Sequence, residues 1–178
     1  NYVSLTVFCL WSLMGAVAWV TPYFFPKAYY EVEYLVVACA SGPLLYLLSE
    51  VTVFGIGLSR KSVYSLCASF VALICCIVLN FSLIPLFGIK GAAISTTLTF
   101  TILLVLKTEF SNKLYGNLIK TSRIYFLTFL YVLYTLFYVS IQPESYLYIC
   151  LWILLMIIVL TSYKDEISNI IKIVKRKL

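Results

Sequence analysis

The sequence predicts an all-α integral membrane protein with six transmembrane helices. The first reason is composition: 63% of the 178 residues are hydrophobic and only 11% are charged. That leaves too little polar surface to cover a soluble globule of this length. The second reason is that short polar or basic segments separate several long apolar runs. This pattern is typical of a multi-pass membrane protein and not of a soluble domain with one anchor.

Six apolar runs are each expected to form one helix, over residues 3–25, 34–58, 63–84, 91–106, 124–141 and 146–163. At ~1.5 Å per residue, a run of about 18 residues covers roughly 27 Å, enough for a slightly thin hydrocarbon core. The first run is not read as a cleavable signal, because no basic segment precedes it and it exceeds a signal's apolar core. We therefore expect a transmembrane bundle over residues 1–163 and a tail over residues 164–178.

Basic residues are divided unequally between the two sides that six spans define. One side holds only Lys27 and Lys90. The other side holds the basic residues of the second loop, the fourth loop and the tail, which are Arg60, Lys61, Lys107, Lys113, Lys120, Arg123, Lys164, Lys172, Lys175, Arg176 and Lys177. The positive-inside rule then places both ends of the chain in the cytoplasm. The net charge of +6 is explained by this topology and by anionic lipid at the cytoplasmic face, so no nucleic-acid partner is expected.

The tail is predicted to be an amphipathic helix on the cytoplasmic leaflet, because apolar residues recur in it at helical spacing with basic residues between them. The apolar positions are Ile167, Ile170, Ile171, Val174 and Leu178, and the intervening basic positions are Lys172, Lys175 and Arg176.

Aromatic residues gather near the predicted outer boundaries, as in interfacial belts; a sugar-stacking surface is the alternative. The first group is Trp19, Tyr23, Phe24, Phe25, Tyr29, Tyr30 and Tyr34, and the last is Tyr138, Tyr146 and Tyr148.

The sequence offers no metal or cofactor chemistry. It contains no histidine, which excludes a histidine-based catalytic triad and a histidine-ligated haem from this chain. Its six cysteines all fall within apolar runs without metal-ligand spacing, where a reduced cysteine behaves as a small hydrophobe. We expect no cofactor, no metal site and no enzymatic activity.

Residues 80–97 form the most informative motif, Asn-Phe-Ser-Leu-Ile-Pro-Leu-Phe-Gly-Ile-Lys-Gly-Ala-Ala-Ile-Ser-Thr-Thr. We expect Pro85 to end a helix and Gly88 to supply a turn on the outer face. Gly91 and Ala92 then open the next helix with side chains small enough for close packing. Gly91, Ser95 and Thr99 continue this small-xxx-small spacing along that helix.

This hairpin resembles that of bacterial polysaccharide-biosynthesis membrane proteins of the O-antigen flippase type, in the multidrug/oligosaccharidyl-lipid/polysaccharide exporter superfamily. Phe25-Pro-Lys-Ala-Tyr29 looks like the outer loop after the family's seventh helix. Gly57-Leu-Ser-Arg-Lys61 looks like the cytoplasmic turn before its ninth.

The resemblance implies that the six spans are the second half of a twelve-helix, MATE-like transporter. The family moves an undecaprenyl-pyrophosphate-linked oligosaccharide across the bacterial cytoplasmic (inner) membrane. Together with a start at Asn1 instead of methionine, it suggests a fragment that lacks an N-terminal six-helix half. Since alternating access needs two bundles, the fragment is not expected to transport alone.

Glu50 is the main candidate for mechanism, because it is the only charged residue well inside a predicted span. Burial of such a group costs roughly 2.5 to 3.5 kcal/mol, which favours a cavity or a cationic partner. We expect it to lie on one helical face with Tyr46, on a helix broken at Gly42-Pro43. It is either a proton or sodium site, a counter-charge to an arginine of the missing half, or a structural carboxyl that is paired or protonated.

The other candidate site residues each have a functional and a structural interpretation. Arg60 and Lys61 at the cytoplasmic mouth either attract pyrophosphate or serve as positive-inside anchors. Asn80 either bonds a sugar hydroxyl or makes a capping or interhelical hydrogen bond.

The sequence also leaves other functions open. A drug or metabolite exporter of the same superfamily is the nearest alternative, because a fold is shared more widely than a substrate. A membrane polysaccharide polymerase or glycosyltransferase is less favoured, since the outer loops are short and carry only Glu31, Glu33 and Glu144. An assembly subunit remains a further alternative.

Overall fold

The structure is a computed structural model that describes residues 2–24, 26, 29, 31–116, 121–142 and 147–177. Every element among these residues is a helix. No strand occurs among these residues. The elements are α1 (Tyr2–Val17), the short 3-10 helix η1 (Ala18–Val20), α2 (Thr21–Phe24), α3 (Val32–Thr52), α4 (Phe54–Leu58), α5 (Val63–Phe87), α6 (Ile89–Tyr115), α7 (Thr121–Ile141), α8 (Leu147–Ser162) and α9 (Lys164–Lys177).

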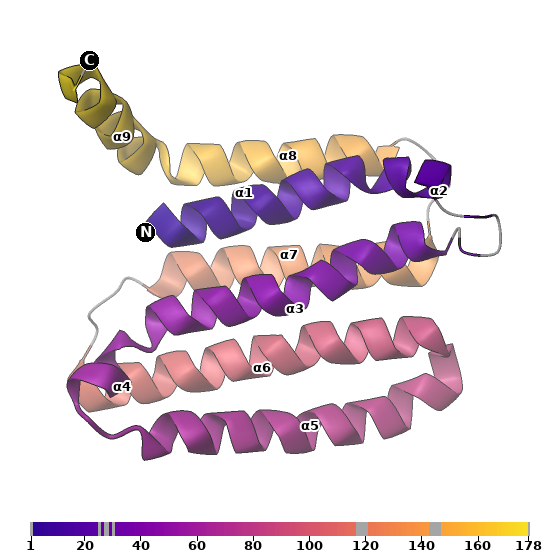
Figure 1. Cartoon of the computed structure of the whole chain (residues 1–178), viewed down its shortest axis with the longest axis horizontal. Coiled ribbons are helices and arrows are strands. Elements are labelled where there is room, and N and C mark those ends of the chain that lie inside the picture. The colour runs from indigo at the N-terminus through magenta and orange to yellow at the C-terminus, as the bar shows by residue number, and fades with distance from the viewer. Residues whose placement is uncertain are drawn as a thin grey trace.

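The long helices run antiparallel in sequence order, so the N-terminus, the α4 to α5 turn, the end of α6 and the start of α9 all lie at one end of the bundle (Figure 1). We call this the N-terminal end. Of the larger basic group, Arg60, Lys61, Lys113, Arg123 and Lys164 lie in turns or helix ends at this end, whereas Lys107 lies within α6. Lys27 and Lys120 lie outside the described residues.

Five helices are long and apolar enough to cross a membrane: Tyr2–Val20, Val32–Thr52, Val63–Phe87, Ile89–Leu114 and Thr121–Ile141. The sixth predicted run forms α8, whose apolar part, Tyr148–Ser162, is shorter. The structure is therefore compatible with an all-α, multi-pass membrane protein.

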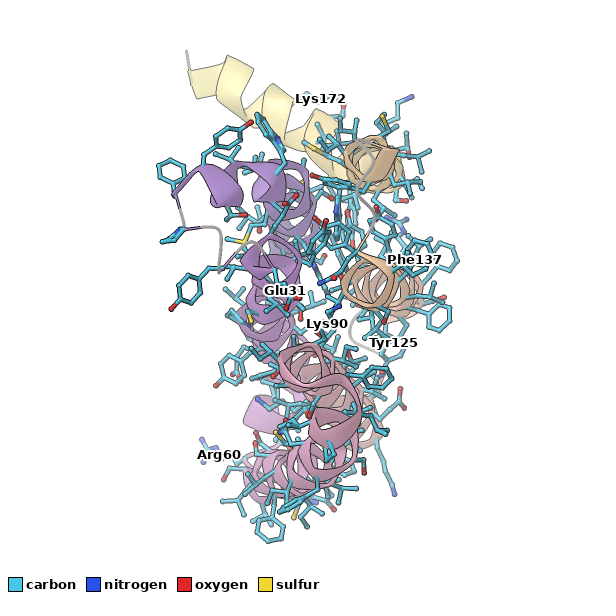
Figure 2. All side chains as sticks on the ribbon, turned by 90° about the vertical axis from the view of Figure 1, so that its right-hand side faces the viewer. Glu31, Arg60, Lys90, Tyr125, Phe137 and Lys172 are labelled. Carbon is cyan, nitrogen blue, oxygen red and sulfur yellow. The ribbon has the colours of Figure 1, made fainter. Side chains whose placement is uncertain are left out.

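The bundle is an elongated stack of helix pairs. Seen end-on, α1 and α3 form one column beside α8 and α7, and α6 followed by α5 extends the stack (Figure 2). α5 packs against α6 at the edge, where only its small residues Ala68 and Ala72 are buried. The rest of α5 presents an apolar surface suited to lipid or to a second bundle.

An aromatic core joins α1, α7 and α8. Tyr131 is fully buried between Phe8 and Trp11, with ring centroids 5.2 and 5.4 Å away. Trp152 of α8 packs over Gly15, where any Cβ atom would clash with the indole ring. Close packing of this core thus depends on a glycine in α1.

The interfacial-belt expectation is wrong for Tyr138 and Tyr148, which are buried in this core at 0% and 5% exposure. The rings of Tyr138 and Tyr148 pack in a tilted arrangement with centroids 5.3 Å apart, and Tyr148 in turn donates a hydrogen bond to Glu33. Trp19, Tyr23, Phe24 and Tyr29 are exposed, as a belt requires. Phe25, Tyr30, Glu144 and Tyr146 lie outside the described residues.

Prolines do not end the helices as the sequence suggested. α5 continues through Pro85 to Phe87, and Gly88, with φ of +58°, makes the turn alone. α3 likewise continues through Pro43, and its break comes at Val53. A proline removes one backbone hydrogen bond, and packing in a transmembrane bundle compensates for that loss.

The close packing predicted at the start of the helix after the hairpin is confirmed for Gly91. A Cβ atom at Gly91 would clash with the backbone carbonyl of Leu83 in α5. Ser95 and Thr99 continue the same buried side of α6, and Ala92 lies in its first turns. The hairpin therefore brings the backbones of α5 and α6 into close contact at Gly91.

Candidate functional site

The interface between α3, α4 and α6 carries a row of polar contacts, which we call the polar seam. Ser41 and Thr97 share a hydrogen bond of 2.8 Å in the part of the seam farther from the N-terminal end. Toward the N-terminal end, Thr52 and Thr108 share another of 2.8 Å. Small hydroxyl side chains let the two helices approach closely and bond across their interface, as is common in membranes.

α4 is attached to the same seam. The backbone N–H of Gly55 donates a 3.0 Å hydrogen bond to the Ser111 hydroxyl. A Cβ atom at Gly55 would lie 2.7 Å from the Ser111 carbonyl oxygen, so only glycine permits this approach. The bond holds the segment after the α3 break against α6.

An ion pair joins Lys107 of α6 to Glu50 of α3 within this seam. The Lys107 Nζ atom lies 2.5 Å from Glu50 Oε1 and donates a hydrogen bond to it. Glu50 is in the last turn of α3, so the ammonium group also lies near the negative end of the α3 dipole. The cationic partner that Glu50 was expected to need is therefore present in this chain.

The two members of the pair differ in exposure. The Lys107 side chain is 4% exposed, whereas that of Glu50 is 46% exposed. The lysine is thus held inside the bundle, with the carboxylate as the accessible group. A ligand or ion that reaches this site meets the carboxylate first.

Tyr46 completes the site one turn before Glu50. The Lys107 ammonium lies 4.9 Å from the centre of the Tyr46 ring, in a cation–π contact. Phe100 of α6 meets the same ring edge-on, with centroids 6.5 Å apart. The prediction that Tyr46 and Glu50 share a face is confirmed, because both contact Lys107.

Two adjoining pockets connect this carboxylate with the N-terminal end of the bundle. The first, of about 280 Å³, is lined by Glu50, Val53, Phe54, Gly57 and Leu58. The second, of about 410 Å³, shares Val53 and Gly57 with it and is further lined by Ile56, Arg60, Ser62 and Ser65. A Cβ atom at Gly57 would meet no neighbouring side chain within 4 Å, so the surface that the two pockets share is open at this residue.

The remaining predicted residues lie away from the ion pair. Arg60 lies at the periphery of the bundle with a positive φ of 54° (Figure 2), and Lys61 beside it is exposed. Asn80 donates a 2.9 Å hydrogen bond to the carbonyl of Cys76 in its own helix. It also lines an apolar pocket with Phe81, Ile84 and Pro85, well separated along α5 from the second pocket.

Sequence reasoning missed Lys107 because it was counted as a loop cation after a span ending at residue 106. α6 instead runs to Tyr115 and places Lys107 within the helix. A signal was present: Thr97, Phe100, Lys107, Thr108 and Ser111 fall on one side of a continuous helix. A lysine on a face of hydroxyl side chains indicates a partner across the interface.

Fold and site together define a multi-span helical membrane protein with a charged pair inside its bundle. Comparison with protein-family models, curated proteins and solved structures finds no match to this chain.

Proposed function

We propose that this chain is one half of a transporter that moves a lipid-linked oligosaccharide from the inner to the outer face of a bacterial cytoplasmic membrane. The single observation that carries the transport proposal is the Glu50–Lys107 pair, whose half-exposed carboxylate opens on the pockets leading to Arg60. Intramembrane charges are costly and usually mark a substrate or ion pathway. The hairpin resemblance supplies the substrate class and the pairing with a second six-helix bundle.

The chemistry of the substrate fits such a pathway. Its hydroxyls and pyrophosphate lose water on entering hydrocarbon, so a translocator must supply polar groups along the way. In this proposal Arg60 and Lys61 attract the pyrophosphate at the cytoplasmic mouth. Glu50 serves as a proton or sodium site that resets the pathway, and Lys107 is its counter-charge when the site is empty. No covalent step is needed, so no catalytic residue is assigned.

A second candidate is an exporter of cationic drugs or metabolites, which one observation favours. The accessible charge at the site is the carboxylate of Glu50, and its pocket is otherwise apolar, with Val53, Phe54 and Leu58. A hydrophobic cation is the ligand that such a pocket suits best.

Translocation assays in a bacterium that lacks its own lipid-linked oligosaccharide flippase test both candidates. The complete transporter containing this chain should restore surface polysaccharide, and Glu50→Gln should lower that activity about tenfold or more. Glu109→Gln is the matched control, because Glu109 is an exposed α6 carboxylate that lies outside the ion pair and accepts a hydrogen bond from Tyr125 of α7. Export of a cationic dye without restoration of surface polysaccharide would favour the second candidate. Unchanged translocation by the Glu50→Gln protein would show that the Glu50 carboxylate has no role in the mechanism.

A further inference from the structure

α9 leaves the bundle abruptly at the N-terminal end. Tyr163 is the only residue between α8 and α9, and α9 turns away from the direction of the long helices (Figure 1). The change in sequence is equally abrupt, since the apolar α8 gives way to Lys164, Asp165 and Glu166. Sequence character and helix direction therefore both change at Tyr163.

Four side chains fix this turn to the bundle, and we call them the α9 clamp: Ser4, Arg123, Tyr163 and Glu166. Tyr163 is 1% exposed and donates a 3.0 Å hydrogen bond to the Ser4 hydroxyl of α1. Arg123 of α7 donates a 3.1 Å bond to the carbonyl of Ser162 at the end of α8. It also pairs with Glu166 in the first turn of α9, 3.4 Å away. The start of α9 is thus held by α1, α7 and α8 together.

Beyond the clamp, the sequence of α9 is amphipathic. Its spacing assigns Ile167, Ile170, Ile171 and Val174 to one side of the helical period and Asn169, Lys172 and Arg176 to the other, where Ile173 is the apolar exception. Ile167 packs against the core of the bundle, so the apolar side of α9 begins at the bundle surface.

We propose that α9 is a membrane-surface arm whose apolar face enters the headgroup region of the adjacent leaflet, while its basic residues bind anionic lipid phosphates. Charge complementarity identifies the occupant. Five basic residues lie in the tail, and each Lys or Arg near an anionic leaflet multiplies its binding about fivefold. The α9 clamp sets the angle that brings this face onto the leaflet.

Residue-specific labelling of the full chain in lipid nanodiscs tests the proposal. Ile171→Cys and Asn169→Cys form a matched pair on opposite faces, and peptide mass spectrometry measures reaction of each new thiol with a membrane-impermeant maleimide. In discs of phosphatidylcholine with 30% phosphatidylglycerol, we expect Ile171→Cys to react about tenfold or more slowly than Asn169→Cys. Adding Lys172→Glu and Lys175→Glu, or using pure phosphatidylcholine, should reduce that ratio to about twofold or less.

Two results would overturn the proposal. Equal labelling of the two faces in anionic discs would show that α9 stands in water. Protection of Ile171→Cys that persists in neutral discs and after charge reversal would show that protein covers the face instead of anionic lipid. Neither result depends on transport activity, so this test of α9 is independent of the proposed function.

Discussion

Burial differs sharply across the Glu50–Lys107 pair, and this difference has an energetic consequence for each residue. Loss of the carboxylate leaves a fully enclosed ammonium group without its counter-charge, which typically costs 3 to 5 kcal/mol. Loss of the ammonium leaves a carboxylate that already reaches the pocket, where water or a cation compensates it. The pair should therefore respond asymmetrically to substitution.

The first prediction concerns these two residues. Glu50→Gln should lower the free energy of unfolding by about 3 kcal/mol, and Lys107→Met by about 1 kcal/mol, because methionine replaces the buried stem without a charge. The double variant should resemble Lys107→Met alone. Thermal unfolding in detergent micelles measures all three, and equal losses in the two single variants would contradict the asymmetry.

The second prediction concerns two glycines with opposite surroundings. Gly91→Ala places a methyl group against the Leu83 carbonyl and should cost about 1 to 2 kcal/mol. Gly57→Ala meets open space and should be neutral, or stabilising by up to about 0.5 kcal/mol, through its better helix propensity. Thermal unfolding distinguishes the two variants, and a Gly91→Ala variant of unchanged stability would contradict the close approach of α5 and α6.

At the scale of elements, α4 is held against α6 by close packing at Gly55, by the buried Ile56 and by one side-chain hydrogen bond. It has only five residues, too few to be stable by itself, and the Gly55 to Ser111 hydrogen bond ties it to its neighbour. Because α4 forms the wall shared by the two pockets, release of this bond should loosen the path between Glu50 and Arg60.

The third prediction follows from that dependence. Ser111→Ala should speed hydrogen exchange of the α4 amides about threefold, which corresponds to about 0.6 kcal/mol for a membrane hydrogen bond. Ser95→Ala is the control, because Ser95 is equally buried on α6 and its hydroxyl has no hydrogen-bond partner among the described residues. Unchanged exchange in Ser111→Ala would assign the position of α4 to apolar packing alone.

Helix existence was predictable from the sequence, whereas several helix ends were not. Apolar runs identified all the long helices, since hydrocarbon length constrains them strongly. The end of α6 was misplaced because a lysine normally marks the edge of a span, and its acidic partner lies 57 residues earlier in the chain. Tyr138 was misassigned for a related reason: composition near a boundary does not reveal which side of a helix faces the core.

At the scale of the whole molecule, the unequal charge distribution and the antiparallel stack agree on which parts share an end. Candidate residues separate along the same axis. Glu50, Lys107 and Arg60 occupy the N-terminal half of the bundle, while Asn80 and the hairpin belong to the opposite half (Figure 1). The sequence predicted this division well, because topology follows from counting spans.

The fourth prediction tests that topology with two turns at opposite ends of α6. Alkaline phosphatase, which is active only outside the cytoplasm, should be active when fused after Gly88 and inactive when fused after Gly116. Both glycines have positive φ and end a helix, so the two junctions are closely matched. Activity at Gly116 would reverse the orientation, and equal activity at both sites would contradict a membrane crossing by α6.

The spacing of the ion pair also bears on how the protein is made. Glu50 is synthesised 57 residues before Lys107, a delay of about 3 to 11 s at 5 to 20 residues per second. During that interval Glu50 lacks its ammonium partner, and an unpaired charge within a span is costly. The ion pair therefore forms only after α6 has been made, and a chain stopped before α6 should be degraded faster by membrane quality-control proteases than the full chain.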